Sequence, residues 1–280
     1  MRVFITGAGG QVGTDLVVAF ADHEVIAATH ATLDVGDPLA CRRAISAAAP
    51  DVIINAAAYT DVDGCESNVE RAWRDNATGP GNVGAAAREI GAFLVTLSTD
   101  YVFDGVAREP YEAHAPHEPV NVYGETKAAG ERAALEANPG ATAIVRSAWI
   151  YGATGTNFVK TMLRLAGERE TLDVVDDQTG SPTWSADLAS AIVSLGAARR
   201  AGVYHVTNAG STTWFGFARE IFSLAGLDAE RVRPTTSDRF PRPARRPVFS
   251  VLSDRTWREA GFSPLRPWRA ALAEALQLFR

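Results

Sequence analysis

Cysteine is scarce in this 280-residue sequence, which contains only Cys41 and Cys65. The two thiols form no CxxC pair and cannot complete a tetrahedral metal site by themselves. A count this low is typical of proteins kept in a reducing compartment. We therefore expect a cytoplasmic protein with isolated thiols, no disulfide framework and no metal site built from cysteines.

Long apolar runs and an excess of basic residues are also missing. No stretch of about 18 apolar residues occurs, so no membrane-spanning segment is expected, and the glycine-interrupted start does not resemble a signal peptide. Lys and Arg total 27 against 33 Asp and Glu, a net charge of −6. A basic surface for nucleic acid is therefore not expected. With 46% hydrophobic and 21% charged residues, the composition fits one large folded domain or two joined ones.

Short apolar runs alternate with longer alanine-rich segments in the first half of the chain. Each run is almost continuously apolar, as in strands that are covered on both faces. Strands are predicted at residues 2–6, 24–29, 51–55, 93–98 and 142–147, and helices at 12–20, 38–48, 66–90 and 123–137. This alternation predicts an α/β fold with a doubly wound parallel sheet.

The pattern loosens after about residue 150. Helices are predicted at residues 157–166, 185–198, 215–225 and 268–279, and strands at 172–175 and 202–206. The proline- and arginine-rich segment 235–247 is predicted to be extended without regular structure. We expect residues 1–150 to form one domain, and residues 151–280 to form mainly a smaller mixed lobe with some segments returning to the first domain.

Three glycines follow the first predicted strand with the spacing GxxGxxG: Gly7, Gly10 and Gly13. The first permits a positive φ at the turn, the second lets a pyrophosphate approach the backbone, and the third lets the helix pack closely. The helix N-terminus then offers free N–H groups and a partial positive charge. Between a strand and a helix, this spacing predicts a dinucleotide site.

The second predicted strand leaves the choice between NAD and NADP open. It ends in Ala28-Thr29-His30, without the acidic residue typical of NAD sites or the arginine typical of NADP sites. Asp34 follows four residues after His30. We expect it to contact the cofactor ribose or the adenine amine, or else to cap a turn.

Hydroxyl, carboxylate and small side chains gather after the third and fourth predicted strands. Residues 55–60 leave room for a flat ligand at the carboxyl edge of the sheet. Thr99 and Asp100 end the fourth strand. Tyr123 and Lys127 are spaced i, i+4, on one face of the next helix. A nearby ammonium lowers the pKa of a phenol, so Tyr123 is predicted to protonate an alkoxide as a hydride arrives.

Together these segments are similar to the extended short-chain dehydrogenase/reductase superfamily and, more narrowly, resemble the dTDP-4-dehydrorhamnose reductase family. The resemblance continues through residues 146–152, 157–159, 176–183 and 245–247, and so covers nearly the whole chain. It implies a Rossmann-type sheet with a C-terminal substrate-binding lobe. It also implies reduction of the C4 ketone of dTDP-4-dehydro-6-deoxy-L-mannose to dTDP-L-rhamnose by NADPH, with NADH also possible.

The resemblance also implies roles for individual residues. Tyr123 matches the proton donor, Lys127 its partner that also binds the nicotinamide ribose, and Thr99 the residue that contacts the substrate oxygen. Substrate contacts are implied for Thr99, Asp100, Trp149 and Arg246: an indole suits a deoxysugar and a guanidinium suits a diphosphate. Implied cofactor contacts are Gly7, Gly10, Gln11, Val12, Gly13, Asp34, Val35, Ala57, Ala58, Tyr59, Thr60, Tyr123 and Lys127.

One position departs from the family pattern, and two alternatives to a reductase stay open. Asp15 stands where some members have a carboxylate, usually Glu, that binds magnesium at a dimer interface. No full set of partners is evident, so Mg²⁺ stays open and a monomer or weak homodimer is expected. The alternatives are another nucleotide-sugar 4-ketoreductase or epimerase, and a non-catalytic NADP-binding subunit resembling the regulatory subunit of methionine adenosyltransferase. A binding subunit would have no need of Thr99, Tyr123 and Lys127.

Overall fold

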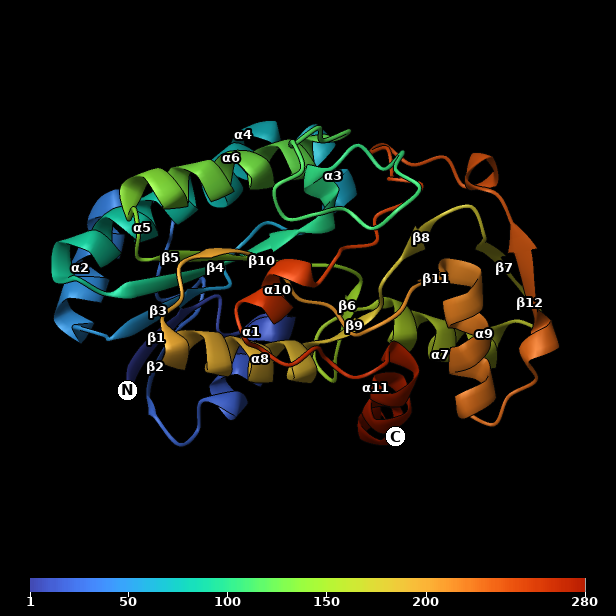
Figure 1. The fold of residues 1–280 in the computed structure, drawn as a ribbon. Helices are drawn as coiled ribbons and strands as arrows, with labels where there is room; N and C mark the ends of the chain where they lie inside the picture. The colour runs from blue at the N-terminus through green and yellow to red at the C-terminus, as the bar shows by residue number, and fades with distance from the viewer. Residues whose placement is uncertain (280) are drawn as a thin grey trace.

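A six-stranded parallel sheet forms the centre of the computed structural model, which describes residues 1–279 (Figure 1). The strand order is β2-β1-β3-β4-β5-β10. The bounds are β1 (Arg2–Thr6), β2 (Glu24–Ala28), β3 (Val52–Asn55), β4 (Phe93–Thr99), β5 (Thr142–Ser147) and β10 (Gly202–His205). The chain order reverses at β1, which places a crevice at the carboxyl ends of β1 and β3. The predicted doubly wound parallel sheet is confirmed.

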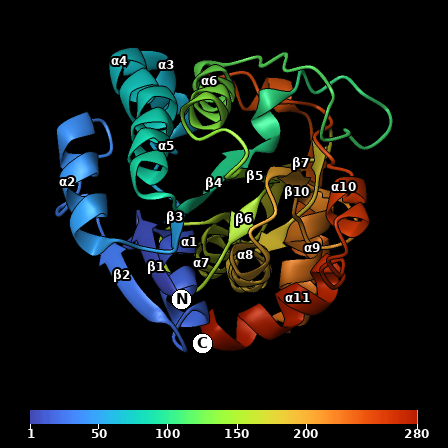
Figure 2. The same ribbon diagram turned by 60° about the vertical axis from the view of Figure 1, so that its left-hand side comes forward.

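Helices cover both faces of this sheet (Figures 1 and 2). One face packs against α1 (Gln11–Ala19) and α8 (Ser185–Ala198), and the other against α2 (Pro38–Ala48), α5 (Gly79–Ile90) and α6 (Val122–Ala137). In β4, Val95 belongs to the first hydrophobic cluster and Leu94 to the second. Because both faces are buried, the strands are apolar throughout rather than alternating.

The single helix predicted over residues 66–90 is wrong. The chain instead forms α3 (Val62–Ser67), α4 (Val69–Ala72), a π-helical turn (Trp73–Thr78) and α5. Asn68 leaves the helical region at φ −118° and ψ 53°. In the π-helical turn, the buried Asn76 side chain bonds to the backbone of Tyr59. Such contacts with distant residues override local helix propensity, and π-turns are frequent at functional sites.

Beyond residue 150 the chain builds a second group of elements, here called the C-terminal lobe. Its helices are α7 (Phe158–Glu168), α9 (Trp214–Leu224) and α11 (Trp268–Ala275). Its short strands pair as β6 (Ile150–Tyr151) with β9 (Thr183–Trp184), β7 (Leu172–Val175) with β12 (Val232–Thr235), and β8 (Thr179–Gly180) with β11 (Thr212–Thr213). The lobe has its own hydrophobic cluster. Arg280, the last residue of the predicted 151–280 segment, lies outside the described residues.

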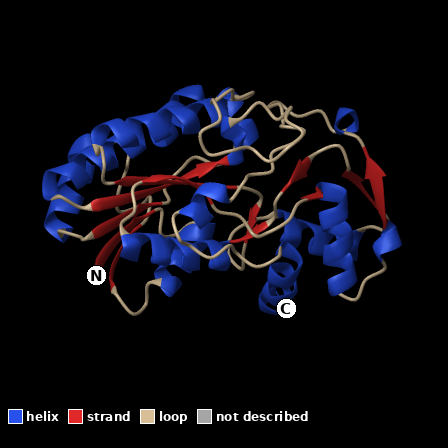
Figure 3. Ribbon diagram, in the orientation of Figure 1, coloured by secondary structure: helices blue, strands red, loops and turns tan. Residues whose placement is uncertain are grey.

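Two later segments return to the first sheet: α8 packs on α1, and β10 adds the last strand, against which α10 (Arg255–Glu259) lies. The proline-rich segment 235–247 is mostly irregular, as predicted, apart from a 3₁₀ turn at Ser237–Arg239. Figure 3 shows the loops gathering between the carboxyl edge of the sheet and the C-terminal lobe. In residues 1–279, no helix combines the length and the apolar character needed to cross a membrane.

Candidate functional site

The glycine loop after β1 is shaped as a phosphate cradle. Gly7 has φ +65°, and a Cβ there would lie 2.7 Å from the Ala56 carbonyl at the end of β3. A Cβ at Gly13 would lie 2.1 Å from the Gly7 oxygen. Helix α1 begins after Gly10, which provides no side-chain cap, so its first N–H groups are available to an anion. These residues fit the diphosphate of a dinucleotide.

Gln11 joins this loop to the C-terminal lobe. Its Nε2 donates to the Ile150 carbonyl at 3.0 Å, and its Oε1 accepts from Nδ2 of Asn157 at 3.0 Å. Val12 follows it in the first turn of α1. The phosphate cradle and the lobe are therefore tied together at the edge of the sheet.

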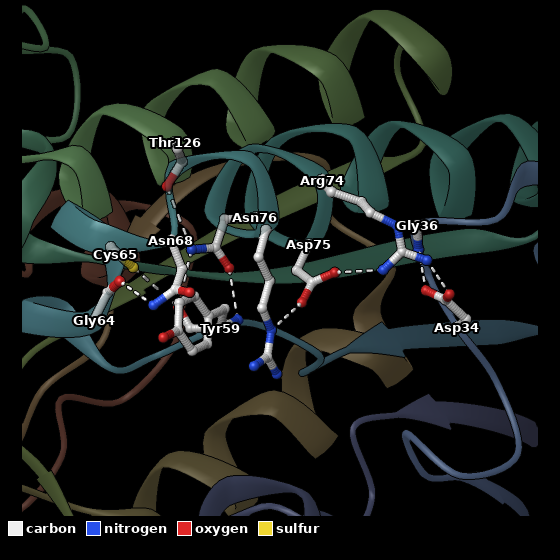
Figure 4. A network of polar contacts seen from close by, with 11 residues as sticks. Asp34, Gly36, Tyr59, Gly64, Cys65, Asn68, Arg74, Asp75, Asn76 and Thr126 are labelled. Atoms are coloured by element: carbon white, nitrogen blue, oxygen red, sulfur yellow. Dashed lines mark hydrogen bonds and ion pairs between the residues drawn. The ribbon is translucent and has the colours of Figure 1, made fainter.

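Asp34 lies beside β2 and is held by an arginine that sequence reasoning missed (Figure 4). Its Oδ1 accepts from the Gly36 amide at 2.9 Å, and its Oδ2 pairs with Arg74 from the π-helical turn. Burial opposes ionisation, but Arg74 and the amide hold the pKa of Asp34 below its usual value. Val35 is buried next to it, and its carbonyl accepts from Asn82 at 2.9 Å. No local pattern marks Arg74, because 40 residues separate it from Asp34.

The segment after β3 is fixed by the same π-helical turn (Figure 4). The Tyr59 amide donates to Oδ1 of Asn76 at 2.7 Å, and Nδ2 of Asn76 donates to the Tyr59 carbonyl at 2.9 Å. Arg71 lies 4.3 Å from the centre of the Tyr59 ring. Ala57 donates its amide to the Thr6 hydroxyl at 3.3 Å. This fixed segment also carries Ala58 and Thr60.

Thr99 and Tyr123 meet at the carboxyl end of β4. The Thr99 hydroxyl donates to Oδ1 of Asp100 at 3.0 Å and accepts from the Tyr101 amide at 3.2 Å. The first turn of α6 is capped by Asn121, which accepts from the Gly124 amide at 2.8 Å and so fixes the backbone around Tyr123. Burial raises the pKa of Tyr123 and Asp100 adds to the rise, while the neighbouring Thr99 hydroxyl opposes it. The phenol therefore keeps its proton at neutral pH.

The expected lowering of the Tyr123 pKa by Lys127 is wrong. The Lys127 ammonium turns to β4 and donates to the Leu97 carbonyl at 2.7 Å. Burial lowers the pKa of Lys127 to about 8, while Glu131 favours the charged form. Lys127 still lies one helical turn from Tyr123, and among residues 1–279 only one of its three N–H donors has a hydrogen-bond partner.

Two buried polar atoms near these residues have no hydrogen-bond partner of good geometry among residues 1–279: Oγ of Ser147, and Oδ2 of Asp100, whose pKa the nearby Ser250 hydroxyl lowers. Ser147 pairs with Thr99 in the β4–β5 register, so both side chains leave the sheet at its carboxyl edge. Burial raises the pKa of Asp100 to about 6. A buried polar atom without a partner is costly, and such atoms at a crevice are typical of ligand contacts.

Trp149 has an unusual backbone conformation, with φ +48°. Its indole stacks on Trp214 with ring centres 3.6 Å apart and an interplanar angle of 7°. A Cβ at Gly180 would lie 2.4 Å from the same indole, so only glycine fits there. Much of the indole is therefore covered by protein. Sequence reasoning missed Trp214, which begins α9, because the stack is visible only in three dimensions.

Arg246 is engaged by a carboxylate of the first domain. Its guanidinium makes a two-point contact with Asp63 of α3, at 2.8 and 3.0 Å. The Ala244 amide and Arg242 also donate to Asp63, at 3.2 and 3.3 Å. The proline-rich segment is thereby held against α3. Arg246 was predicted to lie near a diphosphate, and no local sequence pattern marks Asp63 as its partner.

Asp15, the position discussed for magnesium, accepts a hydrogen bond from the hydroxyl of Ser185 at the start of α8. Within residues 1–279, no group of three or more His, Cys, Asp or Glu side chains is arranged to hold a metal ion. Asp15 thus takes part in the packing of α1 against α8. Both cysteines are buried and free.

Comparisons with known proteins agree with one another. A family model described as the RmlD substrate binding domain matches residues 1–280. The chain is 50% identical to a dTDP-4-dehydrorhamnose reductase of Mycobacterium tuberculosis, over 98% of this chain and 92% of that protein. It is 45% identical to a dTDP-4-keto-6-deoxy-D-glucose reductase of Streptomyces niveus, over 99% and 97%. The solved dTDP-4-dehydrorhamnose reductase of Bacillus anthracis, in complex with NADP, superposes with a TM-score of 0.95 at 39% identity, covering 99% of this chain and 98% of that one.

Proposed function

The chain belongs to the dTDP-4-dehydrorhamnose reductase family, and from this premise we propose that it reduces the C4 ketone of dTDP-4-dehydro-6-deoxy-L-mannose to dTDP-L-rhamnose with NADPH. The observation that carries the proposal is the grouping of Thr99, Tyr123 and Lys127 at the sheet edge that also bears the glycine cradle. A non-catalytic binding subunit would not need this acid and its partners.

The chemistry divides between the cofactor and the chain. When bound, NADPH supplies the hydride. Tyr123 donates its phenol proton to the C4 oxygen, and the phenolate regains a proton from solvent afterwards. Thr99 contacts the same oxygen and the phenol, and Lys127 offers its free N–H donors to the ribose. Because burial keeps Tyr123 protonated at neutral pH, the acid is ready when the ketone arrives.

The remaining contacts are proposed on the same basis. Asp100 uses its unpartnered oxygen to accept from a sugar hydroxyl, and Trp149 offers the uncovered part of its indole to the apolar side of the sugar. Arg246 meets the diphosphate from its place beside α3. The cofactor is held by the other family-implied positions: Gly7, Gly10, Gln11, Val12, Gly13, Asp34, Val35, Ala57, Ala58, Tyr59 and Thr60.

The larger organisation follows from the same proposal. Residues 1–150 bind the cofactor and the C-terminal lobe holds most of the sugar nucleotide. The enzyme works in the cytoplasm, where nucleotide sugars and NADPH are made, as a monomer or weak homodimer. The carboxylate of Asp15 is used in packing, so no step is assigned to a metal ion.

A coupled assay tests the proposal. The pure protein is mixed with NADPH, dTDP-4-dehydro-6-deoxyglucose and a 3,5-epimerase, and NADPH absorbance and the product are followed. We expect NADPH oxidation with dTDP-L-rhamnose as product, and a fall of roughly 10²–10⁴-fold in kcat for Tyr123→Phe. Tyr151→Phe is the matched control, since its buried hydroxyl lies in the C-terminal lobe and has no hydrogen-bond partner within residues 1–279. No NADPH oxidation by the wild-type protein would refute the assignment.

A second candidate is a 4-ketoreductase for the sugar that has not been epimerised. The Streptomyces niveus relative is named for such a substrate and is nearly as similar to this chain. Omitting the epimerase separates the two. NADPH oxidation that needs no epimerase, with a 6-deoxy-D-hexose product, would favour the second candidate and keep the chemistry at Tyr123.

A further inference from the structure

The ammonium of Lys127 is buried, where a cation is poorly solvated. The residue is 5% exposed, and within residues 1–279 the one hydrogen bond of its side chain goes to the Leu97 carbonyl. Burial lowers the pKa of Lys127, and the carboxylate of Glu131 opposes this effect. Glu131 follows Lys127 by four residues in α6, so the two side chains lie on the same helix face.

Glu131 is itself held by strands of the central sheet. Arg146 of β5 makes a two-point contact with its carboxylate, through Nε at 2.8 Å and Nη2 at 2.6 Å. The Ser98 hydroxyl of β4 donates to Oε1. His117 lies 3.2 Å from Oε2. Burial works against the charge of Glu131, yet these donors lower its pKa to about 2, so it is ionised at every working pH.

The positions of these partners matter for the reaction. Ser98 lies between Leu97, which accepts from Lys127, and Thr99, which contacts Tyr123. Ser98 and Arg146 are paired residues in the β4–β5 register. One carboxylate therefore connects the helix that carries Tyr123 and Lys127 to the strand that carries Thr99.

Stability alone does not account for this arrangement. Side-chain exposure is 3% for Arg146 and 2% for Glu131. A buried ion pair of this kind is often no more stable than apolar residues of the same volume. Its charge is of use, however, where a second buried cation must be kept protonated.

We propose that Glu131 is a positioning residue for the reduction: held by Arg146 and Ser98, it keeps Lys127 cationic and fixes α6 against β4. This inference rests on the proposed function, because its test measures that reaction. The titratable and charged groups that face Glu131 are Lys127 on its own helix, Arg146 on β5, and His117 on the loop before α6. His205 on β10 lies behind Arg146, 3.2 Å from Nη1.

The test is the pH profile of kcat for Glu131→Gln, which removes the charge and keeps the shape. In the wild-type protein we expect kcat to fall above pH 8, as Lys127 loses its proton. In Glu131→Gln this alkaline limb should move to lower pH by about one unit. Glu131→Asp keeps the charge but shortens the reach, so kcat should fall while the limb stays near its wild-type position.

Asp187→Asn is the control for a purely structural effect. Asp187 makes a comparable two-point contact with Arg266, at 2.9 and 2.9 Å, away from Lys127. Its loss should lower the melting temperature without moving the limb. The proposal is overturned if Glu131→Gln lowers the melting temperature and leaves the limb in place.

A variant that does not fold and a wild-type protein without activity each have a defined consequence. If Glu131→Gln does not fold, the double variant Glu131→Gln/Arg146→Met, which leaves neither charge unpaired, must show the same shift, and an unshifted limb there refutes the proposal. If the wild-type protein fails to oxidise NADPH with the sugar nucleotide, the proposed function fails first, and the two failures are distinguishable.

Discussion

Replacing Lys127 by Met should make the protein more stable while it abolishes turnover. Burial lowers the pKa of Lys127 from 10.5 to about 8, so the charged form is disfavoured in the folded state. At 1.36 kcal/mol per unit, the cost at pH 7 is about 3 kcal/mol. The variant also loses the hydrogen bond to the Leu97 carbonyl, which offsets about 1–2 kcal/mol of the stability gained by removing the buried charge. We therefore expect Lys127→Met to gain about 1–2 kcal/mol in the free energy of unfolding at pH 7.

The pH dependence of the stability difference between Lys127→Met and the wild-type protein shows whether the buried charge causes it. The folded-state pKa lies below the unfolded value, so the penalty is fully present below pH 8 and is lost as pH rises toward 10.5. Urea unfolding of both proteins at pH 7, 8, 9 and 10 should show the advantage of the variant shrinking and then reversing. Lys160→Met is the matched control, because the chain has no other lysine. A variant less stable than wild type at pH 7, or a difference independent of pH, would refute the reasoning.

Three more predictions concern the walls and the edges of the site. Trp214→Ala removes the indole that stacks on Trp149, so KM for the dTDP-sugar should rise about tenfold while KM for NADPH changes little. The control is Trp257→Phe, because Trp257 lies in the first hydrophobic cluster, against the central sheet. Gly180→Ala places a methyl group against the same indole and should raise the sugar KM similarly, and an unchanged KM would show that Trp149 does not contact the sugar. Incubation with EDTA should leave kcat within twofold of its untreated value, since Asp15 is bonded to Ser185; loss of activity that Mg²⁺ restores would contradict this.

Features that depend on short stretches of sequence were predictable. The five strands of the first part appear within a residue or so of their expected bounds, because strands covered on both faces are apolar without interruption. The glycine cradle was also predictable from the spacing of its glycines. The close contact of Gly13 with Gly7 lies within that short stretch, whereas the contact of Gly7 with Ala56 appears only in the folded sheet. The helix predicted over residues 66–90 failed because Asn76 bonds to Tyr59 and Thr126, whose positions no local propensity records.

In the candidate site, too, some features could be predicted from the sequence and others could not. Tyr123, Lys127 and Thr99 could be found because their residue types and order along the chain suggest a reaction. Their ionisation could not be predicted, since it depends on which charges and carbonyls surround each group after folding. The sequence suggested that Lys127 would act on the Tyr123 phenol. In the structure its ammonium turns to Leu97, and Glu131 lies one helical turn further along α6.

This difference changes which substitutions should alter the pH dependence of the enzyme. If Lys127 lowered the pKa of Tyr123 directly, only changes next to the phenol would matter. In our proposal the charge of Lys127 depends on Glu131, and Arg146 holds Glu131 in place from another strand. Arg146→Lys retains the charge but loses the two-point contact. It should therefore move the alkaline limb of kcat in the same direction as Glu131→Gln and by a smaller amount. An unchanged limb would show that the charge of Lys127 does not depend on Arg146.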